Sequence, residues 1–292
     1  MHRRVWKGLL LTVLLGTSCA QAAAPPGPAP RAPTARERER YPWLSARHLI
    51  RPLAEVLPPP EGYTRVTLEE DSFGAWLRGL PLRPAGTPVL DFRGQRVLSS
   101  SSPALTAVAE LDVGSGDLQQ CADSLIRLHA EWLWSRGERA RIAYRFTSGH
   151  LASWERYAQG ERPRVSGAKV TWVKSAPEAD SRAAFRAYLD MVFTYAGTLS
   201  LAAGPQRPPR ADVRPGDFFV LGGSPGHTVM VLDVARDERG RRVALIGQGF
   251  TPAQDFHVLS PPGGDGPWFS LEEDTVATPF WAPFPWSSLR RW

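Results

Sequence analysis

The chain has 292 residues, of which 42% are hydrophobic and 22% are charged, and its formal net charge is +6. Arg3, Arg4 and Lys7 supply three of those six charges, and the remaining basic and acidic residues are interspersed without a basic stripe. This distribution argues against a nucleic acid as partner. The hydrophobic content is sufficient for a sizeable core in one large domain.

The first 22 residues have the parts of a secretory signal peptide. A basic opening precedes a short apolar run over residues 8–16, and residues 20–22 (AQA) fit a small-x-small cleavage pattern. A second interpretation is open, because residues 16–19 (GTSC) resemble a lipobox and would place a lipid on Cys19. Both predict an exported protein, which is periplasmic, attached to the envelope as a lipoprotein, or secreted. No later segment reaches the roughly 18 consecutive apolar residues of a membrane span.

Residues 23–40 (AAPPGPAPRAPTARERER) are rich in Pro, Ala and alternating charge, which predicts a flexible spacer. Residues 41–292 are predicted to form a single domain. Hydrophobic periodicity and turn residues predict its elements in chain order. These are a helix over 46–56, a strand over 62–70, a helix over 71–80, a turn at 93–94, a strand over 105–114, a helix over 117–135, a strand over 141–146, a helix over 148–160, a strand over 169–174, a helix over 180–204, and strands over 217–222, 227–236, 241–250 and 255–260. Strands that cluster late in the chain favour an α+β fold with an antiparallel sheet.

Cys121 is the only cysteine that remains once the leader is removed, so the mature chain cannot form an intramolecular disulfide. Asp117, with Gln120 three places later, predicts the cap of its helix. A thiol in the first turn would feel the positive end of the helix dipole, which favours thiolate. The alternative is a structural role, because Cys121 shares an apolar stripe with Leu125 and Leu128.

A histidine and an amide lie on the late strands. His227 begins a strand after a Gly-rich loop, and Gln248 interrupts the apolar strand that follows. A base that takes the thiol proton, and a polar group that orients the base, would complete a nucleophilic site. The sequence therefore predicts Cys121, His227 and Gln248 as the catalytic residues, with Asp255 and His257 as alternatives for the third position.

Other kinds of site have weaker patterns. Cys121, His227 and His257 are suitable metal-ligand types, but no pair has the spacing of a metal-binding motif. The glycines of residues 221–227 (LGGSPGH) precede a strand and not a helix, unlike a phosphate-binding loop. Neither a metal nor a cofactor is predicted.

The motifs QQCAD, VSGAKVTWVK, YAGTLSL, GGSPGHTVMVLD and TPAQDFHVL resemble the bacterial domain-of-unknown-function family 4846 (DUF4846) over nearly all of the chain after the spacer. A more distant resemblance is to papain-like cell-wall peptidases, including the CHAP amidases. It rests on a helix-start Cys, a Pro-Gly-Asp strand and a Gly-His-hydrophobic strand. This second resemblance implies a papain-like fold, with Cys121 as nucleophile, His227 as base and Gln248 as the third residue. Cys121 and His227 are separated by about a hundred residues and two extra helices, more than in compact members.

The resulting hypothesis is an exported cysteine hydrolase that acts on an amide bond of the cell envelope, with peptidoglycan or an envelope peptide as partner. Contact with a membrane would come only through a lipid at Cys19. The alternative is a catalytically inactive binding or structural module of the envelope. The tail, residues 279–292 (PFWAPFPWSSLRRW), concentrates aromatic residues and is predicted to close the core.

Overall fold

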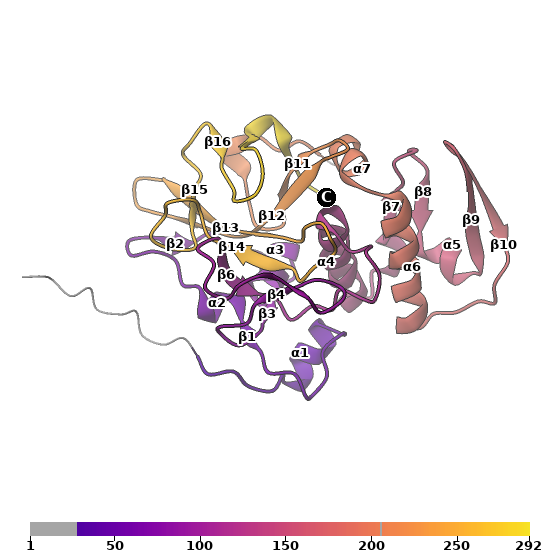
Figure 1. The fold of residues 1–292 in the computed structure, drawn as a ribbon, viewed down its shortest axis with the longest axis horizontal. Coiled ribbons are helices and arrows are strands. Elements are labelled where there is room, and N and C mark those ends of the chain that lie inside the picture. Colours follow the sequence, from indigo (N-terminus) through magenta and orange to yellow (C-terminus); the bar gives the residue numbers. More distant parts are fainter. Residues whose placement is uncertain (1–27, 205) are drawn as a thin grey trace, which may run out of the picture.

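The structure is a computed structural model that describes residues 28–204 and 206–292. The predicted signal peptide, the Cys19 lipid site and the first residues of the spacer lie outside this range. Among the described helices, none combines the length and the apolar character needed to cross a membrane. Figure 1 shows a central antiparallel sheet with helices against it and an extension at one end.

The secondary structure is divided into short helices and strands. The helices are α1 (Ala35–Arg40), α2 (Leu53–Val56), α3 (Phe73–Arg78), α4 (Cys121–Ser135), α5 (Trp154–Ala158), α6 (Arg182–Tyr195) and α7 (Thr198–Ala203). The first strands are β1 (Arg51–Pro52), β2 (Thr64–Arg65), β3 (Pro81–Leu82), β4 (Val89–Leu90), β5 (Arg96–Leu98), β6 (Leu105–Val108), β7 (Ala143–Arg145), β8 (Leu151–Ser153), β9 (Glu161–Ser166) and β10 (Lys169–Lys174). The later strands are β11 (Phe218–Leu221), β12 (His227–Arg236), β13 (Arg242–Gln248), β14 (His257–Leu259), β15 (Phe269–Ser270), β16 (Thr275–Val276), β17 (Phe284–Pro285) and β18 (Leu289–Arg290).

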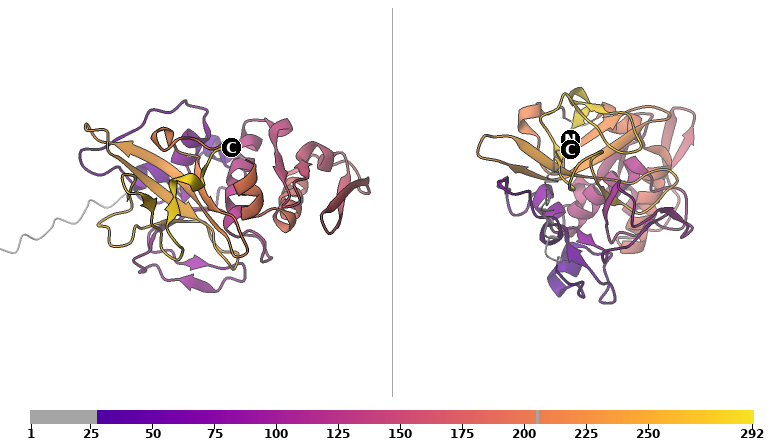
Figure 2. Two further views of the ribbon diagram at one scale, coloured as in Figure 1. Left: turned by 90° about the horizontal axis from the view of Figure 1, so that it is seen from above. Right: turned by 60° about the vertical axis from the view of Figure 1, so that its left-hand side comes forward.

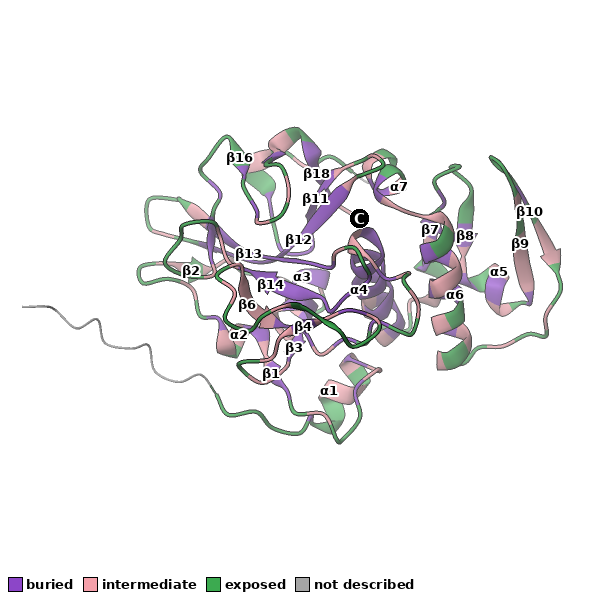
Figure 3. Ribbon diagram, viewed as in Figure 1, coloured by how far each residue is buried: buried purple, intermediate pink, exposed green. Residues whose placement is uncertain are grey.

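The central sheet is built on the hairpin of β12 and β13. Its strand order is β18-β11-β12-β13-β14-β6, with β2 also pairing with β12 and β15 with β13. Every pairing in it is antiparallel, so the predicted α+β class with an antiparallel sheet is confirmed. Strands β12 and β13 are buried along almost their whole length, as Figure 3 shows. Their sequences are apolar almost throughout because a hydrophobic core covers each face of these two strands.

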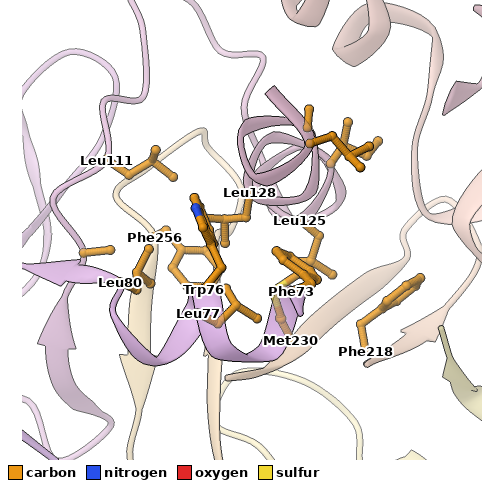
Figure 4. Close-up of a cluster of buried hydrophobic side chains, with 14 of the residues drawn as sticks. Phe73, Trp76, Leu77, Leu80, Leu111, Leu125, Leu128, Phe218, Met230 and Phe256 are labelled. Carbon is orange, nitrogen blue, oxygen red and sulfur yellow. The ribbon is translucent and has the colours of Figure 1, made fainter. Parts of the chain in front are cut away.

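Alternate residues of β12 face two separate hydrophobic cores. Met230 and Leu232 belong to the larger core, which α3 and α4 complete from one side. Leu125 of α4 lies in this core beside Met230, as Figure 4 shows. Val229 and Val231 face the second core, whose other wall is the C-terminal segment. Helix α4 is thus placed against one face of the sheet by its apolar stripe.

The segment between residues 139 and 195 forms an extension beyond α4. It holds the β7–β8 and β9–β10 hairpins with α5 and α6, and Figures 1 and 2 show it at the end of the molecule farthest from β2 and β15. Aromatic packing joins it to α4, since Trp134 stacks on Phe185 with ring centroids 4.4 Å apart. The extension accounts for the long separation between Cys121 and His227.

Several predicted boundaries differ from the structure. The predicted helix over 180–204 is two helices, because the chain is extended at Ala196 and Gly197 between α6 and α7. The predicted helix over 148–160 begins as strand β8 and becomes helical only at Trp154. No element was predicted for residues 161–166, which form strand β9. In these places local propensity is overridden by tertiary packing.

The predicted flexible spacer requires correction over its second half. Residues 35–40 form α1, and Thr34 begins it with a capping box in which Glu37 takes part. The Glu37 carboxylate also accepts hydrogen bonds from Arg31 at 2.7 Å. Arg40 donates to the carbonyl oxygen of Ala75 in α3 at 2.7 Å. The alternating charged residues, from which we predicted a solvated segment, instead cap α1 and form the ion pair and hydrogen bonds that attach it to the domain.

The C-terminal segment packs as predicted. Phe284 and Leu289 are fully buried in the second core, and β18 pairs with β11 at the edge of the sheet. Trp292 reaches the other face and stacks on His129 of α4, with ring centroids 4.4 Å apart and planes 6° apart. The C-terminus is accordingly drawn next to α4 in Figure 1. The tail thus closes both cores.

Candidate functional site

Cys121 is the first residue of α4 and Gln120 is its N-cap. The backbone N–H of Gln120 donates to the Asp123 carboxylate at 3.1 Å. Asp117, the predicted cap, instead accepts from the Gln120 side chain at 3.0 Å and from the Ala253 N–H at 2.7 Å. The helix therefore begins later than predicted, and the thiol lies one turn closer to the helix terminus. The three-residue spacing of Gln120 and Asp123, which matches a capping box, is the sequence feature that could have predicted this start.

The turn before Cys121 is held by a buried polar network that the sequence analysis did not find. The Gln119 side-chain oxygen accepts from Arg127 at 3.2 Å and from Arg186 at 3.0 Å. Its amide nitrogen donates to the carbonyl oxygen of Asp112 at 3.1 Å. Arg127 is itself buried and paired with Glu131 at 2.8 Å. These contacts tie the start of α4 to α6 and restrict the position of the thiol.

Gly249 brings the end of β13 against the start of α4. A Cβ atom at this position would lie 2.8 Å from the carbonyl oxygen of Gln120 and would also collide with Ser124. Only glycine permits this approach. The backbone of the preceding residue, Gln248, therefore lies close to the first turn of α4, while its side chain points to the opposite face of the sheet, like that of Ile246.

The loop that precedes His227 is similarly compact. A Cβ atom on Gly226 would lie 2.7 Å from the carbonyl oxygen of Leu221. Thr198, at the start of α7, donates to the carbonyl oxygen of Gly223 in the same loop at 3.2 Å. The Gly-rich sequence therefore serves a tight return of the chain from β11 to β12, and it places His227 at the first position of β12.

His227 and Gln248 meet across the β12–β13 hairpin as predicted. The register pairs Met230 with Gly247, which sets the two side chains on the same face of the sheet. His227 Nε2 lies 2.7 Å from Gln248 Oε1. Both side chains are buried, with exposures of 1% and 0%. The antiparallel pairing thus joins a histidine and an amide that are 21 residues apart in the chain.

Asp255 and His257, the two alternatives for the third catalytic position, contact different groups. The Asp255 carboxylate is engaged by Arg83 at 2.9 Å and by the Leu90 N–H at 2.9 Å, so it does not orient His227. His257 lies behind Gln248, with the Gln248 amide nitrogen 3.4 Å from its Nε2. Its Nδ1 is 2.9 Å from the carbonyl oxygen of Asp255. Gln248 is therefore the residue that contacts His227, and His257 contacts Gln248.

The Cys121 thiol lies beside the start of β12. The backbone N–H of Thr228, the residue after His227, lies near the Cys121 side chain and favours its thiolate form. Among the hydrogen bonds of the described residues, none joins the sulfur directly to the imidazole. The thiol is therefore next to the His227 backbone. The His227 side chain lies on the same face of β12 as Val229 and Val231, toward the second core, whereas α4 packs on the opposite face, so the thiol and the imidazole are not in contact.

The ionisation of the thiol differs from the prediction. Burial, and secondarily the charge of Asp123, raises the pKa of Cys121 to about 11. Burial lowers the pKa of His227 to about 4, although its hydrogen bond to Gln248 acts in the opposite direction. Loss of hydration outweighs the helix dipole here. The expectation of a lowered thiol pKa is wrong, and the resting pair at neutral pH is a neutral thiol and a neutral imidazole.

Aromatic side chains pack around the His227 ring. Phe250 and Trp281 have ring centroids 4.9 Å and 5.0 Å from the imidazole. Phe280 packs on Phe250 at 6.2 Å, is 53% exposed, and has a positive φ of 72°. A non-glycine residue in this region is strained, and such strain is concentrated at functional sites. These aromatic residues around the imidazole were not predicted from the sequence.

Asp123 is a buried carboxyl group two residues after the thiol. It is 7% exposed, and its Oδ1 atom has no hydrogen-bond partner. Burial raises its pKa to about 8. The group is therefore largely protonated at neutral pH, which avoids an uncompensated buried charge.

We expect Asp123→Asn to flatten the pH dependence of stability. In the unfolded chain the carboxyl ionises near pH 4, whereas in the folded chain it ionises near pH 8. Since the folded state holds the proton more tightly, the free energy of unfolding is highest below pH 4 and falls as the pH rises to about 8. Asparagine cannot titrate, so the variant should be more stable than the wild type at pH 8, by about 1–3 kcal/mol. Urea unfolding at pH 4, 6 and 8 measures this, and parallel curves would contradict it.

The described residues contain no cluster of three or more His, Cys, Asp and Glu side chains that could hold a metal ion. The Gln248 amide stands between His227 and His257, so these two rings do not face one another. The alternative metal site of Cys121, His227 and His257 is therefore not assembled. The groups that do assemble are the two imidazoles and the Gln248 amide between them.

Comparison with known proteins identifies one family. The family described as "Domain of unknown function (4846)" matches residues 53–291. No curated protein and no solved structure matches the chain.

Proposed function

The chain belongs to the family described as domain of unknown function 4846, and we propose that it is an exported cysteine hydrolase that cleaves an amide bond in the cell envelope. The observation that carries the proposal is the pairing of His227 with Gln248 at 2.7 Å, with the Cys121 thiol beside the next residue of the same strand. A helix-start thiol against an antiparallel sheet, with a histidine and an amide on adjacent strands, is the set of groups expected of a papain-like fold. The proposal requires the His227 ring to turn at the start of β12 to reach the sulfur, because its side chain lies on the face opposite to α4. Export rests on the leader sequence.

In the proposed reaction His227 acts as a general base. It takes the proton of the Cys121 thiol while the sulfur attacks the carbonyl carbon of the amide, and a carbon–sulfur bond forms. The N–H groups of the first turn of α4 lack intrahelical partners and can stabilise the oxyanion. The C–N bond then breaks, and the amine leaves with the proton from His227. Water, deprotonated by His227, hydrolyses the thioester to a carboxylic acid and restores the thiol.

The resting pair is neutral, and the proposed reaction has to account for this. With a thiol pKa of about 11 and an imidazole pKa of about 4, full proton transfer is unfavourable before substrate binds, so the proposal requires the proton to move together with attack on the bound amide. The Thr228 N–H supports negative charge on the sulfur as it develops. The aromatic residues near His227 offer a surface for a ring or an apolar group beside the scissile bond. A peptidoglycan peptide, with sugar rings beside its stem, has this chemistry.

The test is to incubate the mature protein with purified peptidoglycan and to analyse the soluble products by mass spectrometry. We expect products with new amine and carboxylate ends, whose summed mass exceeds that of the substrate by one water per cleaved bond. Quenched samples should also contain an acyl adduct on Cys121. Cys121→Ser should release no products, whereas His150→Gln, an exposed histidine in the extension, should behave as wild type. The absence of products from peptidoglycan and from envelope peptides would contradict the proposal.

A second candidate function is an inactive binding module. The raised pKa of Cys121 and the absence of a thiol–imidazole hydrogen bond in the described structure favour it. In the same experiment this protein would sediment with peptidoglycan and release nothing, and Cys121→Ser would sediment equally. The aromatic residues around His227 would then provide the binding surface.

A further inference from the structure

His257 is connected to His227 through one amide. All three side chains are buried, and the exposures of Gln248 and His257 are both 0%. The contacts run from His227 Nε2 to Gln248 Oε1 at 2.7 Å and from Gln248 Nε2 to His257 Nε2 at 3.4 Å. His257 Nδ1 lies 2.9 Å from the carbonyl oxygen of Asp255. Three consecutive polar contacts thus end on a backbone atom whose role cannot change.

The direction of each hydrogen bond follows from that last contact. A carbonyl oxygen only accepts, so His257 Nδ1 must carry the hydrogen. In a neutral imidazole Nε2 then holds the lone pair and needs a donor, which is the Gln248 amide nitrogen. The amide oxygen is left facing His227, where it accepts from Nε2–H. His227 Nδ1 consequently holds the free lone pair.

The opposite amide orientation would be penalised. A flipped Gln248 would place its oxygen against the lone pair of His257 Nε2, and two buried acceptors would face each other without a hydrogen. His257 could relieve this only by moving its hydrogen to Nε2, which would leave Nδ1 without a hydrogen for the carbonyl oxygen of Asp255. The position of one backbone carbonyl therefore determines the state of an imidazole two side chains away.

We propose that His257 is a positioning residue that fixes the orientation of the Gln248 amide, and through it the tautomer of His227, so that Nδ1 is the atom available as base. The value of this tautomer to catalysis rests on the proposed hydrolase function. The tautomer itself is a property of the resting protein and is independent of any substrate.

The test is long-range nitrogen–proton NMR on the full chain with labelled histidine at pH 7, where both rings are neutral because burial lowers the pKa of each to about 4. The wild type should show His257 protonated at Nδ1 and His227 protonated at Nε2, each as a single tautomer. Replacement of each histidine in turn assigns the signals. Either ring found in the other tautomer would overturn the proposal.

Variants separate a positioning role from a structural one. His257→Phe removes the acceptor for the Gln248 amide, so His227 should change from one tautomer to a mixture. Adding Gln248→Glu supplies an acceptor in either orientation and should restore the Nε2-protonated form. His150→Phe, in an exposed part of the extension, should leave the His227 signals unchanged. If His257→Phe folds and His227 keeps a single tautomer, His257 has no positioning role.

The hydrolase assay distinguishes the two proposals. His257→Phe should lower kcat with little change in KM, by part of the roughly 10²–10⁴-fold that a general base contributes. Gln248→Glu/His257→Phe should recover part of that loss. If the wild type cleaves nothing but has the expected tautomers, the proposed function fails and the positioning role of His257 stands.

Discussion

A chain that ends at Pro283 is expected not to fold. The missing residues include Phe284 and Leu289, which are fully buried in the second core, and β18, which covers the edge of β11. Losing side chains of this kind costs about 2–5 kcal/mol each. The deletion also removes Arg291, which pairs with the buried Asp217 carboxylate at 2.6 Å. The combined loss is comparable with the roughly 5–15 kcal/mol by which domains are stable. Circular dichroism and heat-capacity scans of the truncated chain measure the loss.

A single substitution provides a graded version of this test. Trp292→Ala removes the ring that stacks on His129 and contacts Phe218 with centroids 5.0 Å apart. A loss of about 3 kcal/mol should lower Tm by roughly 6–12 °C for a domain of this size. Phe280→Ala is the matched control, because its ring is 53% exposed, and Tm should change by less than about 2 °C. A truncated chain with the wild-type Tm would show that the tail does not stabilise the domain.

If the protein is the hydrolase that we propose, His227→Ala is expected to abolish most of the amide hydrolysis. The substitution removes the proposed base, and a general base contributes about 10²–10⁴-fold to a rate. Gln248→Ala should cost less, since the base remains but is no longer oriented. Progress curves on the peptidoglycan fragments released by the wild type measure both. Circular dichroism separates lost activity from lost folding, because both side chains are buried.

The pH profile provides an independent check on the identity of the base. His227 has a pKa of about 4, so it is neutral and competent at every pH well above that value. The wild-type rate should therefore hold from about pH 8 down to about pH 5 and fall below that, as the imidazole gains its proton. A fall in rate centred near pH 6.5, the pKa of an exposed histidine, would point to a different base. Equal rates for His227→Ala and the wild type would exclude His227 from catalysis.

The residues of the candidate site could be chosen from the sequence because they depend on local patterns. The turn residues at 237–241 (DERGR), between the predicted strands over 227–236 and 241–250, predicted a hairpin, and hairpin register brings the His227 and Gln248 side chains together. The helix that carries Cys121 followed from its apolar stripe, and its last residue, Ser135, was predicted correctly. The start of that helix was misplaced, because Asp117 is used by the distant Ala253 N–H. A long-range partner of this kind has no local signal.

The sequence by itself determined the α+β class, the central antiparallel strands and the candidate set of thiol, imidazole and amide. Periodicity and turn residues act over a few neighbours, and these features require no more than that. The tertiary structure alone decided the chemical state of the set. Burial by elements far apart in the chain raises the pKa of Cys121 and lowers the pKa of His227, and it places the His257 ring behind Gln248. Desolvation depends on everything that packs around a group, so it can be read only once the whole chain is folded.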